Sequence, residues 1–269
     1  MHLAIRHTTQ YRYTHPARYT IQYLRLTPGS DASQRVIDWR LRAPGRATRH
    51  IDGFGNIMHV LVIDGPHDEI AITVQGEVES LDTVGVVPAH NDHLWPVMYL
   101  RPTALTEATQ AVRDFAEPLR GRVEADPLDG LHELSRMVSR AVAYRPGTTG
   151  VETTAAAVLT AGSGVCQDQA HVFAAAARLL GVPTRYVSGY VHVHGDGADE
   201  TASHAWCEAW VEHLGWVAFD VTNEICANDA HVRLAVGPDY LSCAPVRGIR
   251  RGGGGEDMGV EVTVAAMAQ

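Results

Sequence analysis

The apolar residues of this chain change their spacing twice, and this restricts the fold more than any other feature of the sequence. Residues 1–85 partly alternate apolar and polar side chains and are rich in β-branched and aromatic types, which is typical of strands. From about residue 104 to Gly181 the apolar spacing is helical, and after Pro183 the alternation returns. The order predicts an α+β chain, in which a small antiparallel, sandwich-like β domain precedes a core of helices and strands.

Turn-forming residues at 14–16, 27–30, 43–45 and 52–56 separate the apolar runs of the first part. Residues 86–103 have no period and contain three prolines and Trp95. We therefore predict a β domain at 1–85, a linker at 86–103 and a second domain at 104–269. The strands predicted in the first domain are Leu3–Tyr13, Tyr19–Leu26, Arg35–Arg42, Asn56–Ile63 and Glu69–Ser80.

In the second domain, good N-cap residues precede the helical patterns, for example Asp126 before Pro127. The turn at 213–215 predicts a hairpin between the two strands that flank it. The four glycines at 252–255 are expected to form a flexible loop. The predicted helices cover about 107–117, 126–143, 154–160 and 166–181, and the predicted strands cover 184–193, 205–212, 216–221 and 259–265.

Composition sets the cellular context that we expect. The chain has no stretch of eighteen apolar residues, so no membrane span is predicted. Its first residues alternate and lack the apolar core of a secretion signal. The four cysteines form no CxxC pair, which favours reduced thiols and a cytoplasmic location.

The charge is unevenly distributed along the chain. Residues 1–50 carry nine arginines against two acidic residues, whereas the remainder is acidic and the whole chain has a net charge of −9. The arginines are scattered along strand-like segments with no recognition motif beside them, so solvated strand faces are favoured over nucleic-acid binding. All 22 basic residues are arginine. An enzyme of this sequence that joined glutamine to lysine would therefore have no lysine of its own to be joined.

Cys166 stands in a context that suits a nucleophile. A Gly-Ser-Gly sequence at 162–164 comes shortly before it, and a helical apolar run begins at Ala170. Glycines allow a sharp turn and a close approach of the backbone to a ligand, and the positive end of a helix dipole favours the thiolate form of a cysteine. The backbone N–H of Cys166 is also a candidate donor to an acyl oxyanion. A lone cysteine is otherwise a small core residue.

A histidine and an aspartate follow at the predicted hairpin. His204 lies 38 residues after Cys166, and Asp220 lies 16 residues after His204. Taken singly, His204 could be a core histidine and Asp220 could cap the turn that follows it. On neighbouring strands the two side chains could also share a hydrogen bond. In this order the three residues indicate a thiol acyl-transfer site, with a nucleophile, a base and a group that orients the base.

The sequence around these residues resembles a known family. Residues from about 128 to 247 resemble the core of the transglutaminase-like superfamily, whose papain-related fold carries a Cys-His-Asp triad, and the first strands resemble the β domain of its bacterial members. The resemblance implies that Cys166 is the nucleophile, His204 the general base and Asp220 the orienting carboxylate. The family often has Asp-Pro-Thr where this chain has Asp-Val-Thr at 220–222, which we expect to alter only the rigidity of the turn. The matching stretches are 164–171, 181–190, 203–206 and 215–223.

Several neighbouring residues have weaker indications. Asp168 is expected to compensate the helix dipole, and the alternative is a contact to the Gly-Ser-Gly turn or to substrate. Tyr144 and Gln167 are candidates for a second oxyanion donor. The acidic residues at 196, 199 and 200 are typical of a solvated loop tip, and they would attract a cationic amine if that loop overhung Cys166.

Histidines suggest a metal site only weakly. His192 and His194 share one strand face, with Cys207 and His213 nearby in sequence. No CxxC or HExxH spacing completes a ligand set, and we see no calcium-loop pattern. The sequence therefore predicts neither a metal nor a cofactor.

These observations predict a cysteine peptidase or amidase that attacks a peptide or protein amide through a thioester, with hydrolysis favoured. Transamidation to an amine acceptor shares the first half of that chemistry and stays open. A binding or assembly module on the same fold, in which Cys166 is structural, is the alternative outside enzymes, and a metal enzyme that uses the histidines is a further one. No membrane or nucleic-acid partner is expected, and the oligomeric state and the role of the β domain are not indicated.

Overall fold

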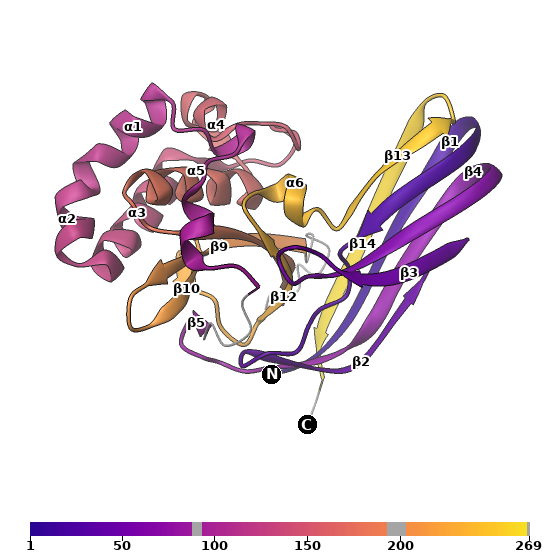
Figure 1. The fold of residues 1–269 in the computed structure, drawn as a ribbon, viewed down its shortest axis with the longest axis horizontal. Helices are drawn as coiled ribbons and strands as arrows, with labels where there is room; N and C mark the ends of the chain where they lie inside the picture. Colours follow the sequence, from indigo (N-terminus) through magenta and orange to yellow (C-terminus); the bar gives the residue numbers. More distant parts are fainter. Residues whose placement is uncertain (88–92, 193–202, 268–269) are drawn as a thin grey trace.

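The computed structural model describes residues 1–87, 93–192 and 203–267 of the chain. Two mainly antiparallel sheets carry the fold, and the helices gather beside the second of them (Figure 1). This arrangement confirms the predicted α+β class with a β domain ahead of a helix-bearing core. No helix among the described residues has the length and apolar character needed to cross a membrane.

The first sheet is built on two long strands, β1 (His2–Leu24) and β4 (Ile57–Ser80), which pair along most of their length. Each was expected to be two shorter strands. The turn residues at 14–16 instead form irregularities in the ladder, where the register shifts between Arg12 and Ala17, so the strand bends without ending. Buried side chains from both halves of β1 and β4 then share one apolar cluster, in which Tyr11, Leu24, Leu61 and Ile72 take part.

Both ends of the chain contribute to this sheet. Strands β13 (Val246–Gly252) and β14 (Glu256–Ala266) pair with β1, on the side opposite β4. Strands β2 (Gln34–Arg42) and β3 (Arg46–Ile51) pair with β4. The last strand, which was predicted as part of the second domain, extends the first sheet instead. Its alternation predicted a strand but could not show that its partner is β1, at the other end of the chain.

The second sheet has the order β11-β10-β9-β8-β12, and the short β5 pairs with β10. Strands β9 and β10 form the predicted hairpin. Apolar side chains of this sheet and of the helices form the largest core cluster. The strands are β5 (Val86–Val87), β8 (Thr184–Val191), β9 (Ser203–Val211), β10 (Gly215–Asp220), β11 (Ile225–Cys226) and β12 (His231–Gly237).

Helix α5 (Cys166–Leu179) packs on β8 and β9 and is buried along most of its length. Its alanines at 174–177 are all buried, which allows the close approach to the sheet that the sequence indicated. The other helical elements surround α5 and the adjoining sheet (Figure 1). They are η1 (Pro96–Leu100), η2 (Ala104–Thr106), α1 (Gln110–Ala116), η3 (Glu117–Leu119), α2 (Arg120–Ala125), α3 (Pro127–Ala141), α4 (Ala155–Ala161) and α6 (Tyr240–Cys243), with a two-residue parallel pair between β6 (Ala143–Tyr144) and β7 (Ser163–Gly164).

The two sheets meet along β12 and β8. Leu3 and Ile5 of β1 form one buried cluster with Tyr190, Val232 and Leu234 of the second sheet. The first sheet is therefore fixed against the core by apolar packing, as well as by the chain connections.

A buried charge network spans the same junction. Glu208 is 1% exposed and binds Arg185 at 2.6 Å (Oε2 to Nε) and Arg233 at 3.2 Å (Oε1 to Nη1). Arg233 also pairs with Asp31 of the first domain. A buried ion that loses its partner is strongly destabilising because the remaining charge has neither water nor a counterion.

Replacing Glu208 by glutamine is therefore expected to lower the free energy of unfolding by about 3–5 kcal/mol, measured by urea denaturation. The control is Glu117→Gln, which removes an exposed carboxylate paired with Arg120 and should leave the midpoint nearly unchanged. Equal midpoints for the two variants would show that the buried network contributes no stability.

Candidate active site

Asp168, in the first turn of α5, holds the turn that leads into Cys166. Asp168, which is fully buried, accepts hydrogen bonds through Oδ2 from the backbone N–H of Val165 (2.8 Å) and from the Thr149 hydroxyl (2.6 Å). A Cβ on Gly164 would lie 2.7 Å from the Asp168 side chain, so only glycine fits there without a shift. Asp168 thus makes the N-terminal hydrogen bond predicted for it, to the backbone of Val165. Its side chain also lies against Gly164, the last residue of the Gly-Ser-Gly turn.

Cys166 is the first residue of α5, as predicted, and its side chain is partly exposed. The first N–H groups of a helix have no partner within the helix. The backbone N–H of Cys166, the predicted oxyanion donor, is one of these groups. Gln167 lines the cleft beside Cys166, whereas Tyr144 is 47% exposed and is not among the residues that line the cleft.

The β9–β10 hairpin brings His204 and Asp220 together. The register pairs Phe219 with Cys207, so Asp220 follows at the end of β10 and His204 lies diagonally across on β9. Nε2 of His204 is 2.8 Å from Oδ2 of Asp220. Cys166 and His204 line the same cleft. Because Nε2 of His204 is engaged by Asp220, Nδ1 is the ring nitrogen that has no bond to the carboxylate. The structure therefore joins His204 to Asp220 by a hydrogen bond and brings Cys166 to the cleft that His204 lines.

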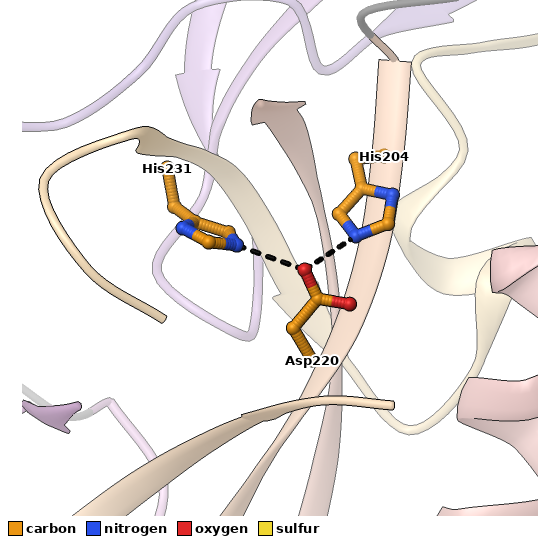
Figure 2. Close-up of side chains that lie close together, drawn as sticks. All are labelled: His204, Asp220 and His231. Atoms are coloured by element: carbon orange, nitrogen blue, oxygen red, sulfur yellow. Dashed lines mark hydrogen bonds and ion pairs between the residues drawn. The ribbon is translucent and has the colours of Figure 1, made fainter. Parts of the chain in front are cut away.

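Sequence reasoning missed a second histidine that binds the same carboxylate. Figure 2 shows the rings of His204 and His231 on two sides of Asp220, each directed at the same oxygen. Nε2 of His231 lies 3.0 Å from Oδ2, and Nδ2 of Asn223 donates to it at 2.6 Å. A carboxylate only accepts hydrogen bonds, so Nε2 of His231 carries a proton. His231 begins β12, three strands from Asp220 in the sheet order, and no local pattern in the sequence marks it.

The hydrogen bonds shift the pKa values of both partners. Burial by itself raises the pKa of Asp220, but hydrogen bonds from His204 and His231 outweigh burial and hold that pKa well below its usual range. Burial lowers the pKa of His204, and the hydrogen bond to Asp220 together with the neighbouring Cys166 and the charges of both raises it to about 10. The arrangement therefore favours an ionised Asp220 beside a protonated His204.

Asp220 also keeps the ordinary role considered for it. Its Oδ1 accepts the backbone N–H of Asn223 at 3.2 Å and so caps the turn after β10. The hydroxyl of Thr222 in the same turn donates to the side-chain oxygen of Gln169 at 2.6 Å. Gln169 lies on α5 and donates to the carbonyl of Val142 at 2.8 Å. Side-chain hydrogen bonds therefore tie this turn to the helix that begins with Cys166.

Two of the residues considered for a metal site have other partners. His192 lies 3.1 Å through Nδ1 from the carbonyl oxygen of Val264, and Cys207 is buried, with its thiol 3.1 Å from the carbonyl of Ala170. His194 and the acidic residues at 196, 199 and 200 lie outside the described residues. In the described part of the chain, one group has metal-ligand spacing, namely His204, Asp220 and His231. Both imidazoles in that group are already hydrogen-bonded to Asp220.

Residues 3–79 match the model of the bacterial transglutaminase-like N-terminal region, and residues 113–221 match that of the transglutaminase-like superfamily. An uncharacterized protein of Mycobacterium leprae is 32% identical over 97% of this chain and 98% of its own length. A protein-glutamine gamma-glutamyltransferase of Pseudomonas aeruginosa is 27% identical over 58% of this chain and 27% of its own length. A crystal structure of a candidate cysteine protease from Cytophaga hutchinsonii covers 100% of this chain and 91% of its own, with a TM-score of 0.79 and 21% identity.

The fold and the family matches together define the class of protein to which this chain belongs. The chain belongs to the transglutaminase-like superfamily and carries the bacterial N-terminal region of that family. The resemblance seen in the sequence is confirmed at this level, and the likeness to the Cytophaga structure shows the shared fold.

Proposed function

We propose that this protein is a cysteine peptidase or amidase that cleaves amide bonds through a thioester on Cys166. The observation that carries the proposal is that Cys166 and His204 line one cleft while His204 is hydrogen-bonded to the buried Asp220. A thiol at a helix start, an imidazole beside it and a carboxylate behind the imidazole have the geometry of nucleophile, base and orienting group.

In the proposed reaction the Cys166 thiolate attacks the amide carbonyl, and a carbon–sulfur bond forms as the carbonyl electron pair moves to oxygen. The oxyanion lies near the first N–H groups of α5. The carbon–nitrogen bond then breaks, and the protonated His204 gives its proton to the leaving amine or ammonia. Neutral His204 next removes a proton from water, which attacks the thioester. The acid leaves, and the thiol is restored.

Hydrolysis is favoured over transamidation because an amine acceptor needs a place for its ammonium group. The described residues that line the cleft beside Cys166 include no aspartate or glutamate. The similarity to a gamma-glutamyltransferase of Pseudomonas aeruginosa supports the alternative, in which a primary amine resolves the same thioester.

Product analysis tests the proposal. The protein is incubated with peptides that contain internal amides and glutamine side chains, with and without a primary amine, and the products are read by mass spectrometry. Peptide scission or ammonia loss is expected. Amine addition would favour the transamidase. No product in any of these reactions, with all four thiols indifferent to iodoacetamide at neutral pH, would contradict the enzyme and favour a binding module.

His231 is expected to act as a positioning residue through Asp220. Replacing His231 with phenylalanine removes the donor to Asp220 but keeps a ring beside Trp206. The imidazole now meets the Trp206 ring edge-on, with 5.3 Å between the ring centroids. The loss of one hydrogen bond to a charged group should lower kcat by about 10- to 100-fold with little change in KM. Because the bond from His231 helps to lower the pKa of Asp220, the acid limb of the pH–rate profile should move to higher pH.

The conservative variant His231→Gln, which keeps an N–H donor, should recover part of kcat and move the acid limb back. A role limited to packing predicts a different pattern, in which the two variants share one pH profile. That pattern would contradict positioning through the hydrogen bond.

A further inference from the structure

The cleft beside Cys166 has walls from both domains. It has a volume of about 270 Å³, and the core contributes Val165, Gln167 and Tyr186 to it. The first sheet contributes residues to the same cleft from alternate positions of β1 and β14. These positions form cross-strand pairs, Thr9 with Val260 and Tyr11 with Met258. Alternate residues of a strand share one face. One face of the first sheet is therefore a wall of the reactive cleft.

The part of this wall on β14 is apolar and uncovered. Met258 and Val260 are 56% and 48% exposed. The next residues on the same face, Val262 and Val264, pack on the buried cluster that joins the two sheets. A single strand face is therefore covered by the core at one end and open to the cleft at the other. Apolar surface next to a reactive thiol is the kind of surface that binds the apolar part of a ligand.

The rest of the wall includes polar side chains that hydrogen-bond to one another. Nδ1 of His7 lies 2.8 Å from the Tyr190 hydroxyl, and Nε2 lies 2.9 Å from the Thr9 hydroxyl. Burial lowers the pKa of His7 to about 4, so its ring is neutral at neutral pH. Both ring nitrogens already have partners, so the His7 ring offers no free charge to a ligand.

The described lining of the cleft includes no aspartate, glutamate or arginine. A charged substrate side chain that entered it would lose water and gain no counterion, which is unfavourable. The thioester keeps the acyl part of the substrate at Cys166 through both half-reactions. The group that occupies the cleft for longest is therefore the acyl group, whereas the amine departs after the first step.

We propose that the first sheet selects the acyl donor, and that the protein takes donors whose side chain next to the reacting carbonyl is uncharged and mainly apolar. The proposal rests on the proposed function and assigns a role to the β domain. In it Met258 and Val260 contact the acyl side chain, and Cys166 bonds to the adjacent carbonyl carbon.

Matched peptidyl chloromethyl ketones test this without knowledge of the natural substrate. Four probes differ only in the residue next to the ketone, which is leucine, glutamine, glutamate or arginine. The Cys166 sulfur displaces chloride from the methylene carbon, forming a carbon–sulfur bond, and mass spectrometry locates the adduct. The second-order inactivation rate with the leucine probe should exceed the rates with the glutamate and arginine probes by at least about tenfold. Comparable rates for the leucine, glutamate and arginine probes would overturn the proposal.

A charge placed on the wall should reverse part of this preference. Val260→Glu is expected to slow the leucine probe and to raise the arginine-to-leucine rate ratio by about tenfold. Thr263→Glu is the matched control, because Thr263 is an exposed residue of the same strand on its opposite face and should leave the ratio unchanged. Met258→Glu is a second wall variant, used if the first fails to fold. A ratio that changes equally in the wall variant and the control would overturn the proposal.

Iodoacetamide separates the two levels of inference. If it labels Cys166 at neutral pH but the probes show no preference, the role of the wall is refuted and the proposed function stands. If Cys166 reacts with neither iodoacetamide nor any ketone, the proposed function fails first, and the inference about the wall fails with it.

Discussion

Replacing Cys166 with alanine is expected to abolish peptide scission, ammonia release and amine incorporation together, because all three begin with the same thioester. The residue is the first of α5 and lines the same cleft as His204. Loss of the nucleophile from a triad leaves only binding and oxyanion stabilisation, so kcat/KM should fall about 10⁴-fold or more. Rates are measured by mass spectrometry of products under single-turnover and steady-state conditions.

The matched control is Cys226→Ala, which removes another partly exposed thiol. It should retain full activity and should still lose that activity to iodoacetamide. Cys207 and Cys243 are less suitable controls because both are buried in the core. A Cys166→Ala protein that still cleaves amides at more than a few per cent of the normal rate would contradict the proposed nucleophile.

Replacing Asp220 with asparagine is expected to have the next largest effect. The asparagine amide keeps the size of the side chain but removes the charge. It has one oxygen where Asp220 uses two, because Oδ2 accepts from His204, His231 and the Asn223 side chain and Oδ1 accepts from the backbone N–H of Asn223. Its NH₂ group would turn a neighbouring imidazole to the wrong tautomer. A change of this kind lowers kcat by up to about 10⁴-fold in a serine triad, and we expect a fall of similar order here.

The pH dependence gives Asp220 a separate test. Burial lowers the pKa of His204, but its hydrogen bond to Asp220 and the neighbouring Cys166 raise it to about 10. The protonated imidazole that serves as general acid therefore persists to alkaline pH, and activity should fall only as the pH approaches 10. Without the carboxylate this alkaline limb should move to lower pH by more than about one unit.

Asp52→Asn is the control for the Asp220 variant. Asp52 is a partly buried aspartate that caps a turn in the first domain and pairs with Arg25. Its replacement should leave both kcat and the alkaline limb in place. An Asp220→Asn protein with a normal limb would show that the carboxylate does not set the proton affinity of His204.

The helix and the hairpin of the site could be predicted from the sequence because both are formed by residues that are close together in the chain. Glycines and a helical pattern surround Cys166, and two alternating runs with a short turn between them place His204 near Asp220. These patterns depend on residues within a few positions of each other, so they can be recognised before the fold is known.

The rest of the site depends on pairings that no local pattern records. His231 reaches Asp220 only because β12 joins the far side of the second sheet, next to β8. Likewise β14 reaches the cleft because it pairs with β1, so that Met258 stands beside Tyr11. The alternation in each segment showed a strand but not its neighbour. The continuity of β1 and β4 could not be predicted for a related reason. Turn-forming residues usually end a strand, but they can also be accommodated within an irregular ladder.

The architecture also explains why a β domain accompanies this core. The first sheet uses strands from both ends of the chain and packs on β8 and β12 through Leu3, Ile5 and Tyr190. A chain that lacked residues 256–266 would lose one wall of the cleft together with the edge of the first sheet. The two domains are therefore expected to act as one unit in substrate binding.

The most direct test of the account is capture of the acyl-enzyme. The protein is mixed with the p-nitrophenyl ester of N-acetyl-leucine, quenched in acid within a second and digested for mass spectrometry. The account predicts a burst of p-nitrophenol and an acetyl-leucyl adduct on the peptide that contains Cys166, which hydroxylamine removes and which His204→Ala greatly diminishes. A burst with the acyl group on any other residue, or turnover with no covalent adduct at Cys166, would contradict it.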